Sequence, residues 1–248
     1  GGITEIEVID KPKIGIIPTG SELVEAGDAM AEGKIIDSNT HMFAGLVKEY
    51  LGEPHRYPTV KDDYNLIKEA ITKAVAENDM VLISAGSSAG AEDYTRNLIA
   101  ELGQVVVHGV AIKPGKPVVL GIVEGKPVIG IPGYPVSAYV VFENFVKPVI
   151  HAYNHQILSE GMSIKAVLSK RLMSSLKHLE FVRMKCGRVN DTFVASPLDR
   201  GAGVTMSLVN ADGILKIPKN VEGYEAGELV DIILMRSQEE IENTLVTI

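Results

Sequence analysis

The sequence predicts a mostly parallel α/β domain followed by a small all-β domain. Short apolar runs alternate with amphipathic helical patterns up to about residue 153, and helical periodicity disappears from about residue 160 onward. Helices between buried-looking strands are typical of a parallel sheet, whereas closely spaced short strands are typical of a barrel or a sandwich. We therefore assign 13–153 to the α/β domain and 160–236 to the all-β domain, with 1–12 as a linker and 237–248 as a shortened tail.

The α/β domain begins with three successive strand–helix units. Its strands are predicted at the apolar runs 13–18, 54–60 and 79–84. Each run precedes a segment with apolar residues at helical spacing, and these helices are predicted at 37–52, 64–78 and 91–103. Asp37 or Ser38 can cap the first helix, and Gly52 can end it.

The domain closes with a strand pair and a last helix. Strands are predicted at 104–112, 117–125 and 126–132, the last two joined by a hairpin turn at Glu124 and Gly125. Pro135 suits the first turn of a helix over 134–153, and Pro148 is expected to kink or end it.

The all-β domain is predicted from short strand-like runs, at 162–172, 180–189, 192–198, 203–209, 213–218 and 228–236. The turn signals between them are Asn190-Asp191, Asp212-Gly213 and Ala226-Gly227. The last twelve residues have an acidic start and an apolar end that resembles a strand.

Composition excludes several classes of protein. The formal net charge is -8, whereas nucleic-acid-binding surfaces are usually basic. No apolar run reaches the ~20 residues that a membrane-spanning helix needs. The single cysteine, Cys186, excludes an internal disulfide and suits a reducing compartment. We therefore expect a cytoplasmic protein with no nucleic-acid or membrane partner, in which Cys186 is a structural thiol.

Small and polar residues follow the predicted parallel strands, where ligands bind in open α/β sheets. Four loops have this position: Thr19–Glu22, Lys61–Asp63, the stretch "SAGSSAGAEDYT" at 84–95, and "GYPVSA" at 133–138. If 126–131 runs parallel to the other strands, its hairpin partner runs antiparallel. The start of that partner, "KPGKP" with Lys113 and Lys116, then lies at the same edge.

These loops combine groups that suit a phosphate-bearing ligand with a divalent cation. Glycines allow a close approach of backbone, helix N-termini favour anions, and lysines neutralise phosphate. Carboxylates suit Mg²⁺, which prefers oxygen ligands. Each feature also has a plain structural interpretation: the glycine loop as a turn, Asp62 and Asp63 as helix caps, and the two lysines as solvated side chains. The histidines lack zinc-site spacing, and "AGSSAG" lacks the ending of a Walker loop.

Several stretches together resemble the MoeA/gephyrin E-domain family of molybdenum cofactor synthesis. They are "PTGSELVEAG", "GKIIDSN", "VKDD", "SAGSSAGAEDYT", "HGVAIKPGKPVVLG" and "GIPGYPVSA", and in the second half "EFVRMKCGRV", "SPLDRGAG" and "NADGILKIP". The resemblance implies a MogA-like three-layer α/β/α domain followed by a β-barrel domain. It also implies insertion of molybdate into adenylylated molybdopterin, with Mg²⁺ and with release of AMP, by a homodimer.

The resemblance implies roles for individual residues. Catalytic roles fall on Glu22, Asp62, Asp63, Asp93, Lys113 and Lys116. Metal binding falls on Asp62 and Asp93. Substrate contacts fall on Thr19, Gly20, Ser21, Gly86, Ser87, Ser88, Gly90, Pro132, Gly133, Tyr134 and Ser137.

The chain departs from the family pattern at two positions and at its start. Ala85 stands where the family usually has the first of two glycines, and Tyr134 stands where many members have Asn. Family members carry two N-terminal domains that contribute to the partner subunit's cleft, so we expect this chain to bind ligand with little turnover. Two alternatives remain open: a molybdopterin adenylyltransferase, and a non-catalytic pterin-binding or regulatory module. Molybdate-dependent AMP release would separate the transferase from both.

Overall fold

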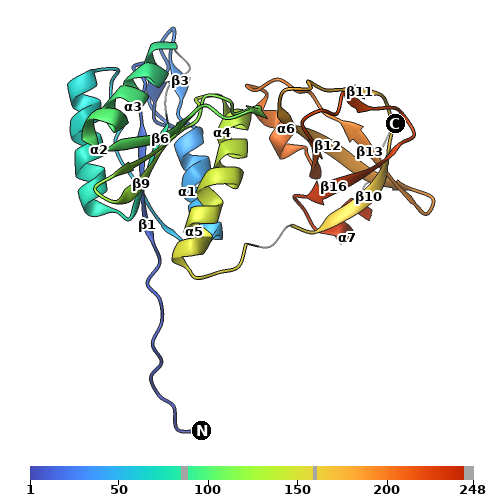
Figure 1. The fold of residues 1–248 in the computed structure, drawn as a ribbon, viewed down its shortest axis with the longest axis horizontal. Coiled ribbons are helices and arrows are strands. Elements are labelled where there is room, and N and C mark those ends of the chain that lie inside the picture. The colour runs from blue at the N-terminus through green and yellow to red at the C-terminus, as the bar shows by residue number, and fades with distance from the viewer. Residues whose placement is uncertain (85–88, 159–160, 243–248) are drawn as a thin grey trace. The chain divides into compact units, whose positions relative to one another are not determined.

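The computed structural model describes residues 1–84, 89–158 and 161–242, without the side chains of 89–93 and 242 (Figure 1). The chain forms two compact units. The first contains Gly1–Gly109, Pro117–Gly133 and Val141–Leu158, and the second contains Val110–Lys116, Tyr134–Val140 and Ser159–Ile248.

The first unit is built on a six-stranded sheet. Its strands, in spatial order, are β4 (Glu53–Arg56), β1 (Lys13–Pro18), β5 (Met80–Ser84), β9 (Lys126–Ile131), β8 (Val119–Val123) and β6 (Gln104–His108). The first four are parallel, and β8 runs antiparallel to both β9 and β6. The predicted reversal at the hairpin is therefore confirmed. Glu124 and Gly125 form the turn with positive φ angles of 51° and 77°.

Helices cover both faces of this sheet. Helices α2 (Tyr64–Glu77) and α3 (Ala89–Leu102) lie on one side, and α1 (Asn39–Glu49) and α5 (Lys147–Tyr153) lie on the other (Figure 1). The core on the α2 and α3 side consists of aliphatic side chains from helix and strand, among them Ile67, Ile71, Leu98, Ile83 and Val128. On the α1 side, Phe43 stacks on Phe142 with ring centroids 5.7 Å apart.

The last helix of the first domain does not end at Pro148, which was one of the two outcomes expected there. Helix α4 (Pro135–Val141) passes into a π-helical turn at Phe142–Val146 and then into α5. Pro148 lies in the first turn of α5, a position where proline is tolerated. The helix therefore passes from the π-helical turn into α5 across the proline.

The second unit contains a closed five-stranded barrel. Successive pairings join β13 (Thr192–Pro197), β10 (Ser163–Leu168), β16 (Leu229–Leu234), β14 (Gly213–Ile217) and β12 (Leu179–Val189), and β12 pairs in turn with β13. The short strand β7 (Ile112–Lys113) pairs in parallel with β12. The barrel implied by the family resemblance is thus confirmed, and Cys186 is buried in its core.

Two local expectations in the second unit are wrong, and a helix forms where none was predicted. Residues 203–209, expected as a strand, contain helix α6 (Thr205–Val209). Asp212 and Gly213 do not form a turn, since Asp212 is buried and Gly213 begins β14. The acidic start of the tail forms helix α7 (Gln238–Glu242), and Ile241 packs in the barrel core at 1% exposure. The expected terminal strand falls at 243–248, outside the described residues.

Candidate functional site

The carboxyl ends of β1, β4 and β5 lie together at one edge of the first sheet. Backbone N–H and side-chain Oγ1 of Thr19 both donate to the Ser84 carbonyl, at 2.9 and 3.1 Å. The Gly20 N–H donates to the Val60 carbonyl at 3.0 Å, next to a parallel bridge between Thr19 and Val60. The loops that follow β1 and β4 are therefore tied together where the sequence places the site.

Ser21 and Asp62 form the most specific contact between these two loops. The Ser21 N–H donates to Asp62 Oδ2 at 3.0 Å, and the Asp62 N–H donates to Ser21 Oγ at 3.1 Å. Both residues are exposed. This reciprocal pair fixes the Asp62 carboxylate at the sheet edge. Its other oxygen, Oδ1, accepts no hydrogen bond from the described part of the chain, so no protein donor there competes with a ligand for it.

Asp63 has a different role from its neighbour. Its Oδ1 accepts hydrogen bonds from the N–H groups of Asn65 and Leu66, both at 3.0 Å. This is the N-cap of α2, which satisfies two of the four unpaired N–H groups at the helix start. The contacts of Asp63 therefore support its interpretation as a helix cap.

Glu22 folds back over the loop that carries it. Gly20 has a φ of +149°, and a Cβ at that position would lie 2.9 Å from Glu22 Oε2. Glycine is favoured at position 20 by its backbone conformation, whereas a Cβ there would meet the flexible end of the Glu22 side chain, which could shift. Glu22 itself is half-buried.

The glycine loop is only partly described. Gly86, Ser87 and Ser88 lie outside the described residues, while Gly90 and Asp93 belong to α3 without a described Asp93 side chain. The pairing of Asp62 with Asp93 around a metal therefore stays a prediction. Among the described residues, no group of three His, Cys, Asp or Glu side chains could hold a metal ion.

The two lysines belong to the second unit, not to the first unit with the other loops. Lys113 lies in β7, and its Nζ is 3.5 Å from Oε1 of the buried Glu180. Glu180 also accepts hydrogen bonds from Arg200 and from Ser174 Oγ. Burial alone would raise the pKa of Glu180, but these hydrogen bonds and the charges of Arg200 and Lys113 outweigh burial and lower it. Lys116 follows in the same segment.

The loop after β9 is divided between the units. Pro132 and Gly133 belong to the first unit, where the Gly133 carbonyl accepts a hydrogen bond from Asn39 Nδ2 at 2.8 Å. Tyr134 and Ser137 belong to the second unit, with Tyr134 52% exposed and Ser137 buried. Asn39, at the start of α1, is a residue of this edge that the sequence analysis missed.

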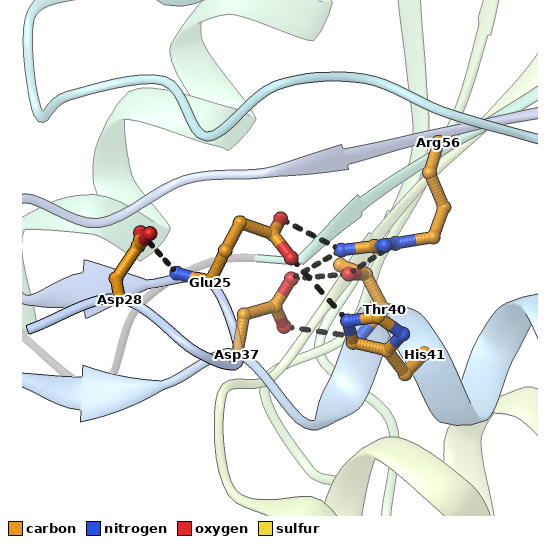
Figure 2. Close-up of polar contacts among 6 residues, drawn as sticks. All are labelled: Glu25, Asp28, Asp37, Thr40, His41 and Arg56. Atoms are coloured by element: carbon orange, nitrogen blue, oxygen red, sulfur yellow. Dashed lines mark hydrogen bonds and ion pairs between the residues drawn. The ribbon is translucent and has the colours of Figure 1, made fainter.

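A cluster of charged side chains at the end of β4 was also missed, apart from Asp37, which was expected only as a helix cap. It contains Glu25, Asp37, Thr40, His41 and Arg56 (Figure 2). The Arg56 guanidinium donates from Nη2 to Glu25 Oε1 at 2.8 Å and from Nε to Thr40 Oγ1 at 3.0 Å, and its Nη2 lies 3.5 Å from Asp37 Oδ2. The available sequence signal was a lone arginine in a short strand, together with acids at both ends of residues 25–37, which come between the first strand and the first helix.

Asp37 anchors the cluster to α1. Its side chain is 1% exposed, and it accepts hydrogen bonds from both the N–H and Oγ1 of Thr40. Asp37 therefore satisfies the helix start in place of Ser38, whose side chain makes no cap hydrogen bond. His41 Nε2 lies 3.4 Å from Glu25 Oε2 on the solvent side of the cluster (Figure 2).

Comparison with known proteins places this fold and site in context. The "Probable molybdopterin binding domain" family model matches residues 15–152, and the "MoeA C-terminal region (domain IV)" model matches residues 165–235. A protein of Methanocaldococcus jannaschii named for molybdopterin biosynthesis is 40% identical over 243 residues, which are 95% of this chain and 58% of that protein. The molybdopterin molybdenumtransferase of Staphylococcus aureus is 30% identical over 95% of this chain and 57% of its own length.

Solved structures agree with these matches. The crystal structure of the molybdopterin biosynthesis MoeA protein from Pyrococcus horikoshii is similar with a TM-score of 0.79 and 35% identity, over 92% of this chain and 55% of that one. The chain thus spans little more than half the length of the relatives it matches. With both regions matched in order along one sequence, the chain belongs to the molybdopterin-binding-domain family, in the MoeA arrangement in which a MoeA C-terminal region follows that domain.

Proposed function

We propose that this chain acts in molybdenum cofactor biosynthesis as the pterin-nucleotide-binding part of a molybdopterin molybdenumtransferase. The reaction would insert molybdate into adenylylated molybdopterin and release AMP. The observation that carries the proposal is the presence of both matched regions in one chain, in the same order as in relatives that bear this name. The MoeA C-terminal region disfavours the adenylyltransferase alternative, since the resemblance associates that region with the molybdenumtransferases.

The geometry at the sheet edge supports a Mg²⁺-dependent ligand site. Asp62 presents a fixed, exposed carboxylate whose Oδ2 is held by the Ser21 N–H. Mg²⁺ is commonly bound by one or two carboxylates together with water and substrate phosphate oxygens, so a single described carboxylate fits this mode. Asp62 and Asp93 would hold the ion, which would neutralise charge on the phosphates of the nucleotide.

The remaining site residues would supply recognition of the ligand. Lys113 and Lys116 would neutralise phosphate or molybdate charge, and the loops around Thr19, Gly86 and Gly133 would contact the pterin nucleotide through backbone groups. We further propose that the protein is a cytoplasmic homodimer assembled through the first unit, with a mass measurable by light scattering. In the described residues, no helix combines the length and apolar character of a membrane span.

The Asp62 carboxylate provides the test of this function. With wild-type chain, calorimetry should show that Mg²⁺ strengthens AMP binding. Asp62→Asn should remove most of this gain, about tenfold or more in affinity, because a charge-assisted contact is lost. Asp231→Asn, which removes an exposed carboxylate of the barrel, is the matched control and should bind AMP normally.

The reaction itself separates the candidate functions. Full-length protein should release AMP from adenylylated molybdopterin only when molybdate is supplied. Formation of adenylylated pterin from ATP would instead identify an adenylyltransferase, and AMP binding without either reaction would identify a binding module. Normal Mg²⁺ dependence in Asp62→Asn would exclude Asp62 from the metal site.

A further inference from the structure

Residues 22–36 form an arm that leaves the sheet after Ser21 and returns at Asp37. The arm contains two short parallel strands, β2 (Leu23–Val24) and β3 (Ile35–Ile36). Its outer part has little packing, since residues 25–36 are half-buried or exposed throughout this fully described stretch. Met30, Ile35 and Ile36 are 57%, 49% and 47% exposed. Burial of apolar surface therefore does not explain why the arm stays in place.

Polar contacts hold the arm at its two ends. We call residues 22–25 the outgoing root and residues 35–37 the returning root. Within the arm, the Ile35 N–H donates to the Glu22 carbonyl at 3.0 Å, and the Asp37 N–H donates to the Val24 carbonyl at 2.9 Å. Lys34 Nζ donates to the Ser21 carbonyl at 2.6 Å. These bonds join the two roots to each other and to the loop after β1, but none of them joins the arm to β4.

Arg56 supplies the connection to β4. As the last residue of that strand, it reaches Glu25 at the outgoing root, Asp37 at the returning root and Thr40 in the first turn of α1 (Figure 2). The Arg56 side chain is 24% exposed, so its contacts are partly shielded from water. The planar guanidinium group of arginine can donate hydrogen bonds in several directions at once, which suits this position, whereas the ammonium group of a lysine donates only from a single nitrogen.

The arm carries a residue of the proposed site. Glu22 lies three residues before Glu25 and directly follows Ser21, which is paired with Asp62. A displacement of the outgoing root would therefore move Glu22 relative to Asp62. We propose that Arg56 is a positioning residue, which fixes the arm against β4 and thereby holds Glu22 in the orientation that the ligand requires. This proposal rests on the proposed function, which assigns Glu22 to the ligand site.

Hydrogen exchange of the chain without ligand tests the positioning of the arm. In Arg56→Gln, amides of residues 23–36 should exchange about tenfold faster than in wild type, whereas amides of β1 and β5 should keep their protection. Wild-type arm exchange should also accelerate when salt rises from about 0.05 to 0.5 M, because ionic contacts near the surface are screened. This salt response should be largely absent from the variant.

Two further variants separate positioning from general stability. Glu25→Gln removes the arm's own side of the contact and should reproduce the local effect even if Arg56→Gln folds poorly. Lys68→Gln breaks an exposed pair with Glu101 on α2 and α3, and is the matched control that should leave the arm unchanged. Arg56→Lys should restore part of the protection. Unchanged arm exchange in both Arg56→Gln and Glu25→Gln, or an equal acceleration throughout the sheet, would overturn the proposal.

The consequence for the ligand is measured with AMP and Mg²⁺. Arg56→Gln should weaken AMP binding several-fold, measured at a temperature well below the melting temperature so that the variant is fully folded, because a displaced Glu22 would no longer meet the ligand in the required orientation. Normal affinity together with a loosened arm would overturn the role of Arg56 in positioning Glu22. If wild-type chain does not bind AMP, the proposed function fails, while the exchange experiment still decides whether Arg56 fixes the arm.

Discussion

Asp62 and Asp63 show how two adjacent, chemically identical side chains take different roles. Asp62 is paired with Ser21 across two loops, whereas Asp63 accepts both of its hydrogen bonds from the first turn of α2. The sequence predicted both as site residues and offered capping as the alternative. Only the backbone direction at the loop end distinguishes the two, since it decides which carboxylate turns toward the helix and which toward the sheet edge.

Replacement of Asp63 should therefore reduce stability rather than ligand binding. Asp63→Ala should cost about 1 kcal/mol, or about 2–4 °C in melting temperature, because two N–H groups of α2 lose their acceptor. Asp63→Ser should retain most of this stability, since serine is also a good N-cap. Thermal unfolding followed by circular dichroism, with AMP binding in parallel, checks both. Weaker AMP binding with an unchanged melting temperature would instead indicate that Asp63 belongs to the ligand site.

Buried acids with raised pKa values predict a loss of stability at alkaline pH. Burial, followed by the charge of Asp212, raises the pKa of Cys186 to about 12, and burial with a hydrogen bond to Glu77 raises that of Tyr57 to about 12. Both groups hold their protons more tightly in the folded state than in the unfolded state. Their contribution is therefore complete below the unfolded pKa values of about 9 and 10, and is lost as pH rises toward 12.

The melting temperature should accordingly fall between about pH 9 and 12. Cys186→Ala should make this fall shallower, even though the lost side-chain volume lowers stability at neutral pH. Lys177→Ala, on the barrel surface, should leave the slope unchanged. An identical slope in wild type and Cys186→Ala would show that the thiol does not contribute to it.

Secondary-structure elements were predictable where local pattern and tertiary role agree. Helix α2 and strand β5 have the apolar spacing of their type, and the structure forms both within a residue or two of the expected bounds. Residues 203–209 failed because their conformation depends on distant groups: Ser207 Oγ accepts a hydrogen bond from the buried Arg183 of β12 and donates to the Val204 carbonyl. No local pattern carries that information.

Helix α7 is an element whose role is testable. Ile241 is 1% exposed within the barrel core, so the helix packs on the barrel although no helix was predicted there. Ile241→Ala should destabilise the second unit by about 2–4 kcal/mol through the cavity that it leaves. Ile157→Ala, at a side chain 93% exposed, is the control and should have no measurable effect. Denaturant unfolding measures both, and equal midpoints would show that α7 does not contribute to the barrel.

At the scale of the whole molecule, the sequence located the convergence of loops but not their division between units. The parallel direction of the strands and the antiparallel hairpin followed from periodicity and from the turn at Glu124, and they correctly placed the loops after β1 and β4 at one edge. The lysines were assigned to the first unit because they lie between two of its strands in sequence. Lys113 lies in β7, which pairs with β12 across more than sixty residues of sequence, and a local pattern cannot reveal such a contact.

The place of β7 in the second unit has a consequence for dividing the chain into separate units. Because Val110–Lys116 and Tyr134–Val140 are interleaved with the first unit, the chain crosses between the units at 109/110, 116/117, 133/134, 140/141 and 158/159. A gene cut at any single crossing separates strands or helix turns that belong to one unit. A cut at 158/159 would keep the five barrel strands together but would separate them from β7 and from Tyr134–Val140. During synthesis β7 is made more than sixty residues before β12, so it has no partner strand until β12 leaves the ribosome.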